Sequence, residues 1–257
     1  MKIIDPETLD DRGRMMLLYG ETGVGKTLSI LISAPKPLLW LPMERKDVKR
    51  NYRLAMEIGG LQKGDIDIAY YEDWDDTMAF FFDPAHMEKY ATIFPDGLTH
   101  LMGVDMMQQI ENQSLDAMKK DKATSDKAIT KSLAYMSKGG IENYGTLLTM
   151  SVRLISALTK LHEHGKCVIF SALLDEAPKW DRELSAGPLI SGKAFAKSMP
   201  QFFGTIGMVV SRLQKGKVTY PPGVMLRSDD GSFMARFTGH PDSNVRVRLD
   251  IQKILEL

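Results

Sequence analysis

The chain has 257 residues, enough to bury one large α/β core, and its 33 basic and 33 acidic side chains leave no net charge. This balance excludes a global electrostatic pull toward DNA or a membrane, so any nucleic-acid surface must be local. The single cysteine, Cys167, excludes an intramolecular disulfide, and there is no apolar stretch of membrane-spanning length. Because the first residues are acidic, we expect that they are not a signal peptide. We therefore expect a cytoplasmic protein with no membrane partner.

The first strong signal along the chain is a glycine-rich motif of the form G-x-x-x-x-G-K-[ST]. Apolar runs at 15–19 and 28–32 flank it, which predicts a strand, a loop and a helix. A glycine loop can turn backbone N–H groups inward around a phosphate, and the helix adds the positive end of its dipole. The predicted nucleotide-binding residues are Gly20, Glu21, Thr22, Gly23, Val24, Gly25, Lys26, Thr27 and Leu28.

Two side chains of this motif carry the predicted chemistry. Lys26 is expected to place its charge against the β- and γ-phosphates, and the Thr27 hydroxyl to take one coordination position on Mg²⁺. The motif therefore predicts ATP and Mg²⁺ as cofactors.

Strand and helix patterns alternate after this loop. The first helix is expected to end near residue 33, before two prolines, and the apolar run 37–42 to form a buried strand. Glu44 follows that strand. Because open α/β sheets bind ligands at the carboxyl ends of their strands, Glu44 is a candidate catalytic residue. A helix over 47–58, a strand over 66–71 and a core-forming aromatic segment within 72–94 complete this part.

The apolar run 98–105 is predicted to be the next strand, and it ends in Asp105. A carboxylate at a strand end is what the magnesium side of a phosphate-loop site requires, so we favour Asp105 as a metal residue over an ordinary capping Asp. The lysine-rich segment 106–141 is equally compatible with nucleic-acid contacts and with a solvated helix face or mobile loop.

The second half of the chain contains the clearest helix, over 142–164, followed by a buried strand over 166–174. The segment 175–191 is rich in Gly, Pro and charge, and we expect a structureless connection that is functional or disordered. A strand over 205–210 follows, and the tail predicts a β-hairpin over 224–237 around a turn at 228–231.

In their order these motifs resemble the RecA-like ATPase core, and most of all the compact phage and prophage RecA-like ATPases implicated in single-strand annealing. The resemblance covers roughly residues 14–212 and implies an α/β fold with a mainly parallel central sheet flanked by helices. It implies one RecA-like ATPase domain over 1–257, with 213–257 as a C-terminal hairpin extension. It also implies head-to-tail self-association into a ring or filament, with single-stranded DNA as partner, in a bacterial or phage-infected cell.

The resemblance also assigns roles to residues. Glu44 would activate the attacking water, with Lys26 as the second catalytic residue, while Lys193 and Lys197 would reach the nucleotide of a neighbouring subunit. Two departures from the family pattern, Leu173 at a polar sensor position and Pro42 at an acidic one, favour slow hydrolysis. The DNA-binding candidates, with Trp180 either a stacking surface or a loop anchor, are Lys119, Lys120, Lys122, Lys179, Trp180 and Arg182.

A rival hypothesis is a nucleotide-dependent assembly or interaction module that does not bind DNA, which the zero net charge and Leu173 favour. A small-molecule or nucleoside kinase has less support, because no Arg-rich lid follows the core. Binding of single-stranded DNA across a salt series separates the first two readings.

Overall fold

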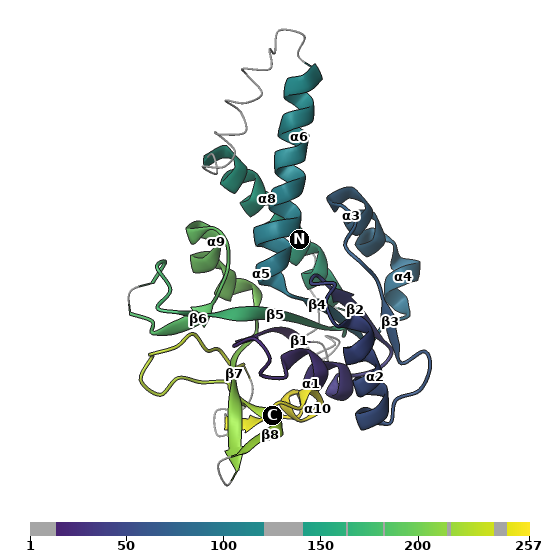
Figure 1. Ribbon diagram of the computed structural model, residues 1–257, viewed down its shortest axis with the longest axis vertical. Helices are drawn as coiled ribbons and strands as arrows, with labels where there is room; N and C mark the ends of the chain where they lie inside the picture. The colour runs from purple at the N-terminus through teal and green to yellow at the C-terminus, as the bar shows by residue number, and fades with distance from the viewer. Residues whose placement is uncertain (1–13, 121–140, 163, 182, 215–216, 239–245) are drawn as a thin grey trace, which may run out of the picture.

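The computed structural model describes residues 14–120, 141–162, 164–181, 183–214, 217–238 and 246–257. In this part of the chain, nine strands form one sheet in the order β3-β2-β4-β5-β1-β7-β8-β9, with β6 paired to β5 (Figure 1). The strands are β1 (Arg14–Gly20), β2 (Leu38–Pro42), β3 (Ile66–Ile68), β4 (Thr92–Asp96), β5 (Cys167–Glu176), β6 (Ala186–Pro188), β7 (Thr205–Gln214), β8 (Lys217–Met225) and β9 (Arg246–Arg248).

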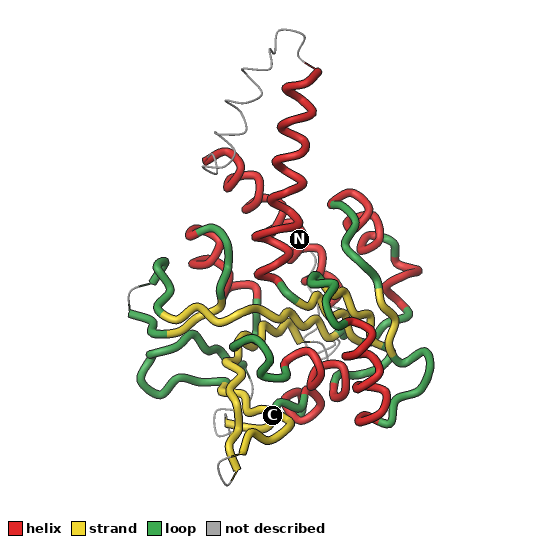
Figure 2. The backbone as a smooth tube through the Cα atoms, viewed as in Figure 1, coloured by secondary structure: helices red, strands yellow, loops and turns green. Residues whose placement is uncertain are grey.

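Helices cover both faces of this sheet. They are α1 (Lys26–Ser33), α2 (Val48–Gly59), α3 (Trp74–Phe82), α4 (Pro84–Glu88), α5 (Leu98–His100), the π-helical turn η2 (Leu101–Met106), α6 (Met107–Lys120), α8 (Ile141–His162), α9 (Lys193–Ser198), the 3₁₀ turn η3 (Met199–Phe202) and α10 (Ile251–Leu255). The sheet runs across the middle of the molecule, with α6 and α8 on one side and α1, α2 and α10 on the other (Figure 2).

The central strands are parallel. β1 lies between β5 and β7, so that Leu17 is opposite Phe170 on one side and Ile206 on the other. β4 lies in the same way between β2 and β5. The carboxyl ends of these strands therefore meet at one edge, which confirms the expected mainly parallel sheet.

The apolar run of β1 is buried on both faces, as the sequence predicts for a central parallel strand. Met15, Leu17 and Tyr19 point into the core beneath α8, whereas Met16 and Leu18 point into the core beneath α1 and α2. Because alternate side chains of one strand anchor helices on opposite faces, β1 fixes the position of the loop that follows it.

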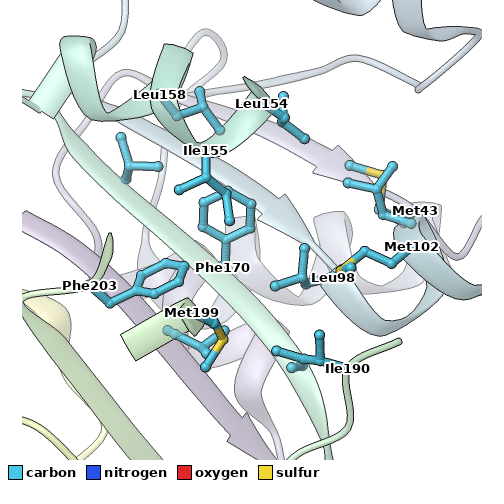
Figure 3. Packing of buried hydrophobic residues seen from close by; sticks show 14 of the residues in the cluster. Met43, Leu98, Met102, Leu154, Ile155, Leu158, Phe170, Ile190, Met199 and Phe203 are labelled. Carbon is cyan, nitrogen blue, oxygen red and sulfur yellow. The ribbon is translucent and has the colours of Figure 1, made fainter. Parts of the chain in front are cut away.

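Aromatic and branched side chains fill the core on the α8 side. Figure 3 shows Ile155 of α8 above the ring of Phe170 on β5, with Phe203 beside it. The two rings meet edge to face, with their centroids 5.6 Å apart. This packing places β5, and the site residues it carries, firmly beneath α8.

The segment 98–105 is helical, so the prediction of a strand ending in Asp105 is wrong. Leu98, Leu101 and Met102 are buried, whereas Gly103 and Val104 are exposed. This spacing of three and four residues is helical, and alternation along a strand would not produce it. Asp105 therefore lies on η2 and not at the end of a strand.

The prediction of a structureless connection over 175–191 is wrong for the end of β5 and for β6, which both lie within it. β5 continues to Glu176 and turns back through β6, with Leu174 opposite Pro188 and Glu176 opposite Ala186. Backbone hydrogen bonding in this antiparallel pair orders a segment whose composition alone suggested a loop.

The C-terminal antiparallel strands are confirmed, but their pairing falls earlier than predicted. β7 pairs with β8, and β8 pairs with β9. The segment predicted as the second hairpin strand instead forms two isolated bridges, from Phe233 to Ala186 and from Arg236 to Ile206.

The lysine-rich segment is partly described. Its first part forms α6, which extends away from the sheet (Figure 1), and residues 121–140 lie outside the described residues. Of the helices described, none combines the length and the hydrophobicity needed to cross a bilayer.

Candidate active site

The glycine-rich loop connects β1 to α1 at the carboxyl edge of the sheet. A side chain at Gly20 would place its Cβ 2.4 Å from the Val209 carbonyl oxygen, so only glycine allows β1 and β7 to approach this closely. Gly23 and Gly25 have φ angles of 77° and 98°, in the left-handed region that favours glycine. The loop conformation therefore depends on the glycines that define the motif.

Lys26 folds back over this loop. Its Nζ donates hydrogen bonds to the carbonyl oxygens of Gly20 at 2.7 Å and Glu21 at 2.8 Å. Burial lowers the pKa of Lys26 to about 8, against the charges of Asp96, Glu44 and Glu21, which act in the opposite direction. The site thus holds a buried ammonium group whose charged form is disfavoured by burial and favoured by the nearby carboxylates.

Asp96, the last residue of β4, is the partly buried acid of the site. Its Oδ2 accepts hydrogen bonds from the Thr27 hydroxyl at 2.9 Å and from the Trp40 indole N–H at 3.1 Å. Its Oδ1 accepts one from the Ser171 hydroxyl at 2.5 Å. Donors from α1, β2 and β5 therefore converge on one carboxylate.

The ionisation of Asp96 reflects two opposing effects. Burial raises the pKa of the Asp96 carboxyl, while its three hydrogen-bond donors and the nearby Lys26 ammonium favour the charged form. A cation bound at Thr27 would favour the carboxylate further, because positive charge stabilises an adjacent anion.

Glu44 is exposed and lies beyond the end of β2. The Met43 N–H donates a hydrogen bond to the Asp96 carbonyl oxygen at 3.0 Å, so the ends of β2 and β4 are joined one residue before Glu44. The charge of Glu44 is close enough to raise the pKa of Lys26. The structure therefore places this carboxylate at the edge of the same site.

Asp105 does not share this environment. Its Oδ1 lies 3.8 Å from Nε2 of His100, and burial raises its pKa, with His100 and Arg45 opposing. The hydrogen bond from the Thr27 hydroxyl is accepted by Asp96 and not by Asp105. The strand-end argument for Asp105 applies to Asp96, nine positions earlier in the sequence.

Sequence reasoning missed Asp96, Ser171 and Trp40. The sequence does contain a signal for Asp96, since residues 92–96 form a short apolar run that ends in Asp. The run also contains Pro95, and proline is disfavoured in a central strand because it cannot donate a backbone hydrogen bond. No local signal identifies Ser171 or Trp40, because only the pairing of β2, β4 and β5 brings them to Asp96.

The candidate neighbour-contacting lysines lie on one helix. Lys193 and Lys197 are exposed on α9, which begins after Gly192. Their proposed role across a subunit interface stays a prediction.

The described DNA-binding candidates lie at the end of α6 and in the connection between β5 and β6. Trp180 is only 8% exposed and packs within the core beside Gly187, which favours the loop anchor over the stacking surface. Lys179 is exposed beside it. Lys119 and Lys120 end α6, while Lys122 and Arg182 lie outside the described residues.

Thr27 and Asp96 fit a Mg²⁺ site. Among the described residues, no group of three or more His, Cys, Asp or Glu side chains is placed to hold a metal. Mg²⁺ at phosphate loops needs few protein ligands, because phosphate oxygens and waters complete its shell. A hydroxyl hydrogen-bonded to a partly buried carboxylate is the donor set that such a site uses.

Comparison with known proteins matches residues 12–220 to the AAA domain family AAA_24. Among solved structures, the chain is similar to the KaiC-like protein PH0186 of the hyperthermophilic archaeon Pyrococcus horikoshii OT3, at 13% identity over 83% of this chain and 77% of that one, with a TM-score of 0.40. It is also similar to the flagellar accessory protein FlaH of Methanocaldococcus jannaschii, at 10% identity over 87% and 82%, with a TM-score of 0.43. No curated protein matches.

Proposed function

We propose that this chain, which belongs to the AAA domain family, is a RecA-like phosphate-loop ATPase that binds ATP with Mg²⁺ and hydrolyses the terminal phosphate. The observation that carries the proposal is the hydrogen bond between Thr27 and Asp96 directly after the loop that holds Lys26. This contact joins the phosphate loop to the strand-end acid that phosphoryl transfer requires.

Each residue has a defined part in this proposal. Lys26 leaves the carbonyl groups of the loop and binds the β- and γ-phosphates, which offsets the negative charge that grows during transfer. Glu44 orients the attacking water or accepts its proton. Thr27 and Asp96 hold Mg²⁺, which when bound neutralises charge on the phosphate oxygens.

The active assembly that we propose is a head-to-tail oligomer. Glu21, Thr22 and Glu44 are exposed, so the site is open on the side where a neighbouring subunit would cover it. Lys193 and Lys197 are exposed on α9 and available to reach the nucleotide of that neighbour. A ring or a filament would satisfy this arrangement equally.

The partner that we propose is single-stranded DNA, in recombination or strand annealing. The rival is an assembly module that uses ATP but does not bind DNA, and the burial of Trp180 favours this rival because it removes one stacking surface. Fluorescence anisotropy with labelled single strands at low salt, with and without ATP, separates them: binding supports the DNA partner, and its absence in both states supports the module.

The test of ATP hydrolysis compares the wild type with Lys26→Ala. We expect phosphate release from ATP by the wild type that requires Mg²⁺, and no release by the variant, since the loop then lacks its cation. Binding of a fluorescent ATP analogue should weaken in the same variant. A wild type that binds the analogue but releases no phosphate, alone or with single-stranded DNA, would contradict hydrolysis and leave only nucleotide binding.

A further inference from the structure

A cavity of about 650 Å³ opens beside the start of α2. It lies at the same edge of the sheet as Glu44, because Arg45 is both the next residue in the chain and part of the cavity wall. The side chains that give the cavity its character are Arg45, Asp47, Lys49, Arg50, Arg53 and Tyr70. Four of these six side chains are cationic and one is acidic.

Most of this positive charge is not neutralised within the described part of the chain. Arg45 lies 3.6 Å from Glu72, with both side chains more than half exposed. Lys49, Arg50 and Arg53 are exposed, and in the described residues they form no ion pair. The cavity therefore presents an uncompensated cationic surface to solvent.

Helix stability does not explain these charges. The first turn of α2 contains no acidic residue, and Lys49 and Arg50 place positive charge at the positive end of the helix dipole. Lys49 and Arg53 are four residues apart, so they lie on one face and repel each other. Both arrangements disfavour the isolated helix, and a bound anion would relieve both.

An aromatic ring completes the site. Tyr70 is 44% exposed, and the guanidinium carbon of Arg45 lies 5.0 Å from the centroid of its ring. A cationic surface that follows a phosphate backbone, next to a partly exposed aromatic ring, is the combination by which proteins bind single-stranded nucleic acid without sequence preference. An acidic protein segment would use the charges but would have no base to stack on the ring.

We propose that this cavity, which we call the α2 pocket, binds single-stranded DNA, with phosphates on Lys49, Arg50 and Arg53 and a base on Tyr70. The inference rests on the proposed DNA partner, and it places the contact on α2 instead of on the lysines selected from the sequence. It does not depend on ATP hydrolysis. The bound strand would lie next to Glu44, where it can affect the site.

The experiment uses the full chain and a labelled oligothymidine in anisotropy titrations across a salt series. The test variant is Lys49→Gln/Arg50→Gln/Arg53→Gln. The control variant, Lys63→Gln/Arg153→Gln/Lys253→Gln, removes the same number of positive charges from exposed positions to which no role is assigned. We expect the test variant to lose at least tenfold in affinity and its log–log salt slope to fall by about 2, since each single-strand phosphate contact contributes about 0.7. The control should change little.

A second pair of variants tests the aromatic contact. Tyr70→Ala should weaken binding about tenfold with little change in the salt slope, because stacking does not release counterions, whereas Tyr70→Phe should bind like the wild type. Equal weakening in both would contradict stacking.

Three outcomes would overturn the proposal. The first is wild-type affinity in the triple variant of the α2 pocket, and the second is no binding by the wild type at low salt with or without ATP. If the wild type binds no DNA but still hydrolyses ATP, the proposed ATPase activity is retained and only the DNA partner is contradicted. The third is loss of oligomers in the α2 variant, with the binding loss fully explained by dissociation, which would make the pocket a subunit interface.

Discussion

The Thr27 hydroxyl donates a hydrogen bond to Oδ2 of Asp96 at 2.9 Å, although 69 residues separate the two in the chain. The contact joins the first turn of α1 to the end of β4 across the intervening β5, whose Ser171 binds the other oxygen of the same carboxylate. These two contacts hold the carboxylate beside the phosphate loop, at the carboxyl edge of the sheet.

Replacing Asp96 should affect hydrolysis far more than replacing Asp105. Asp96→Asn keeps the shape but removes the charge beside Thr27, and we expect Mg²⁺ affinity or activity to fall about 10–100-fold, as for other residues that orient metal ligands. Asp105→Asn should retain most of the activity, since Asp105 contacts His100. Phosphate release as a function of Mg²⁺ concentration measures both. An equal loss of activity in the two variants would show that Asp105 also takes part in the active site.

Glu44→Gln should bind ATP but hydrolyse it poorly. The amide cannot accept a proton, and loss of a general base typically lowers the rate about 10²–10⁴-fold. Because Glu44 is exposed, its replacement should leave the melting temperature almost unchanged. Single-turnover phosphate release, with nucleotide affinity measured in parallel, tests this. Normal hydrolysis by the variant would remove Glu44 from the mechanism.

Nucleotide binding should be linked to protonation of Lys26. Its pKa of about 8 in the free protein lies below the usual 10.5, and a bound triphosphate should raise it by opposing charge. ATP binding should then take up protons above about pH 8, and affinity should fall as the pH rises further. Calorimetry of ATP binding near pH 8.5, in two buffers that differ in their heat of ionisation, measures the proton uptake. Lys26→Arg is the control, because the arginine guanidinium stays protonated at this pH. Buffer-independent heats would contradict the linkage.

The lowered pKa of Lys26 also affects the stability of the folded protein. Between about pH 8 and 10.5 the unfolded chain holds the Lys26 proton that the folded, nucleotide-free protein has released. The contribution of Lys26 to the free energy of unfolding should therefore rise with pH in this window.

Two glycines should respond to alanine in opposite directions. A Cβ at Gly207 would lie 2.7 Å from Val224 and 3.0 Å from Leu226, so Gly207→Ala overpacks the core and should lower the free energy of unfolding by about 1–3 kcal/mol. At Gly145, within α8, a Cβ meets nothing within 4 Å, so Gly145→Ala should stabilise by up to about 1 kcal/mol through helix propensity. Urea denaturation compares the two, and a neutral Gly207→Ala would show that β7 can move away from β8.

Much of the fold followed from local patterns. The helix of α8 and the strands β1, β2, β5 and β7 were predicted from apolar runs and periodicity, because these elements bury long, regular stretches of side chains. The short elements were less predictable. β4 has five residues and includes Pro95, and the turn of the chain between β5 and β6 depends on pairing that no local window contains.

By itself, the sequence determined the phosphate loop, since its glycines, lysine and threonine are contiguous and their backbone demands are local. Only the tertiary structure decided which acid faces Thr27, because the order of strands in the sheet brings Asp96 and Ser171 together and leaves Asp105 on a helical turn. The same holds for Trp180, whose ring is buried by contacts with residues distant in the chain. A motif encodes its own conformation, but the neighbours of a side chain depend on how the whole chain packs.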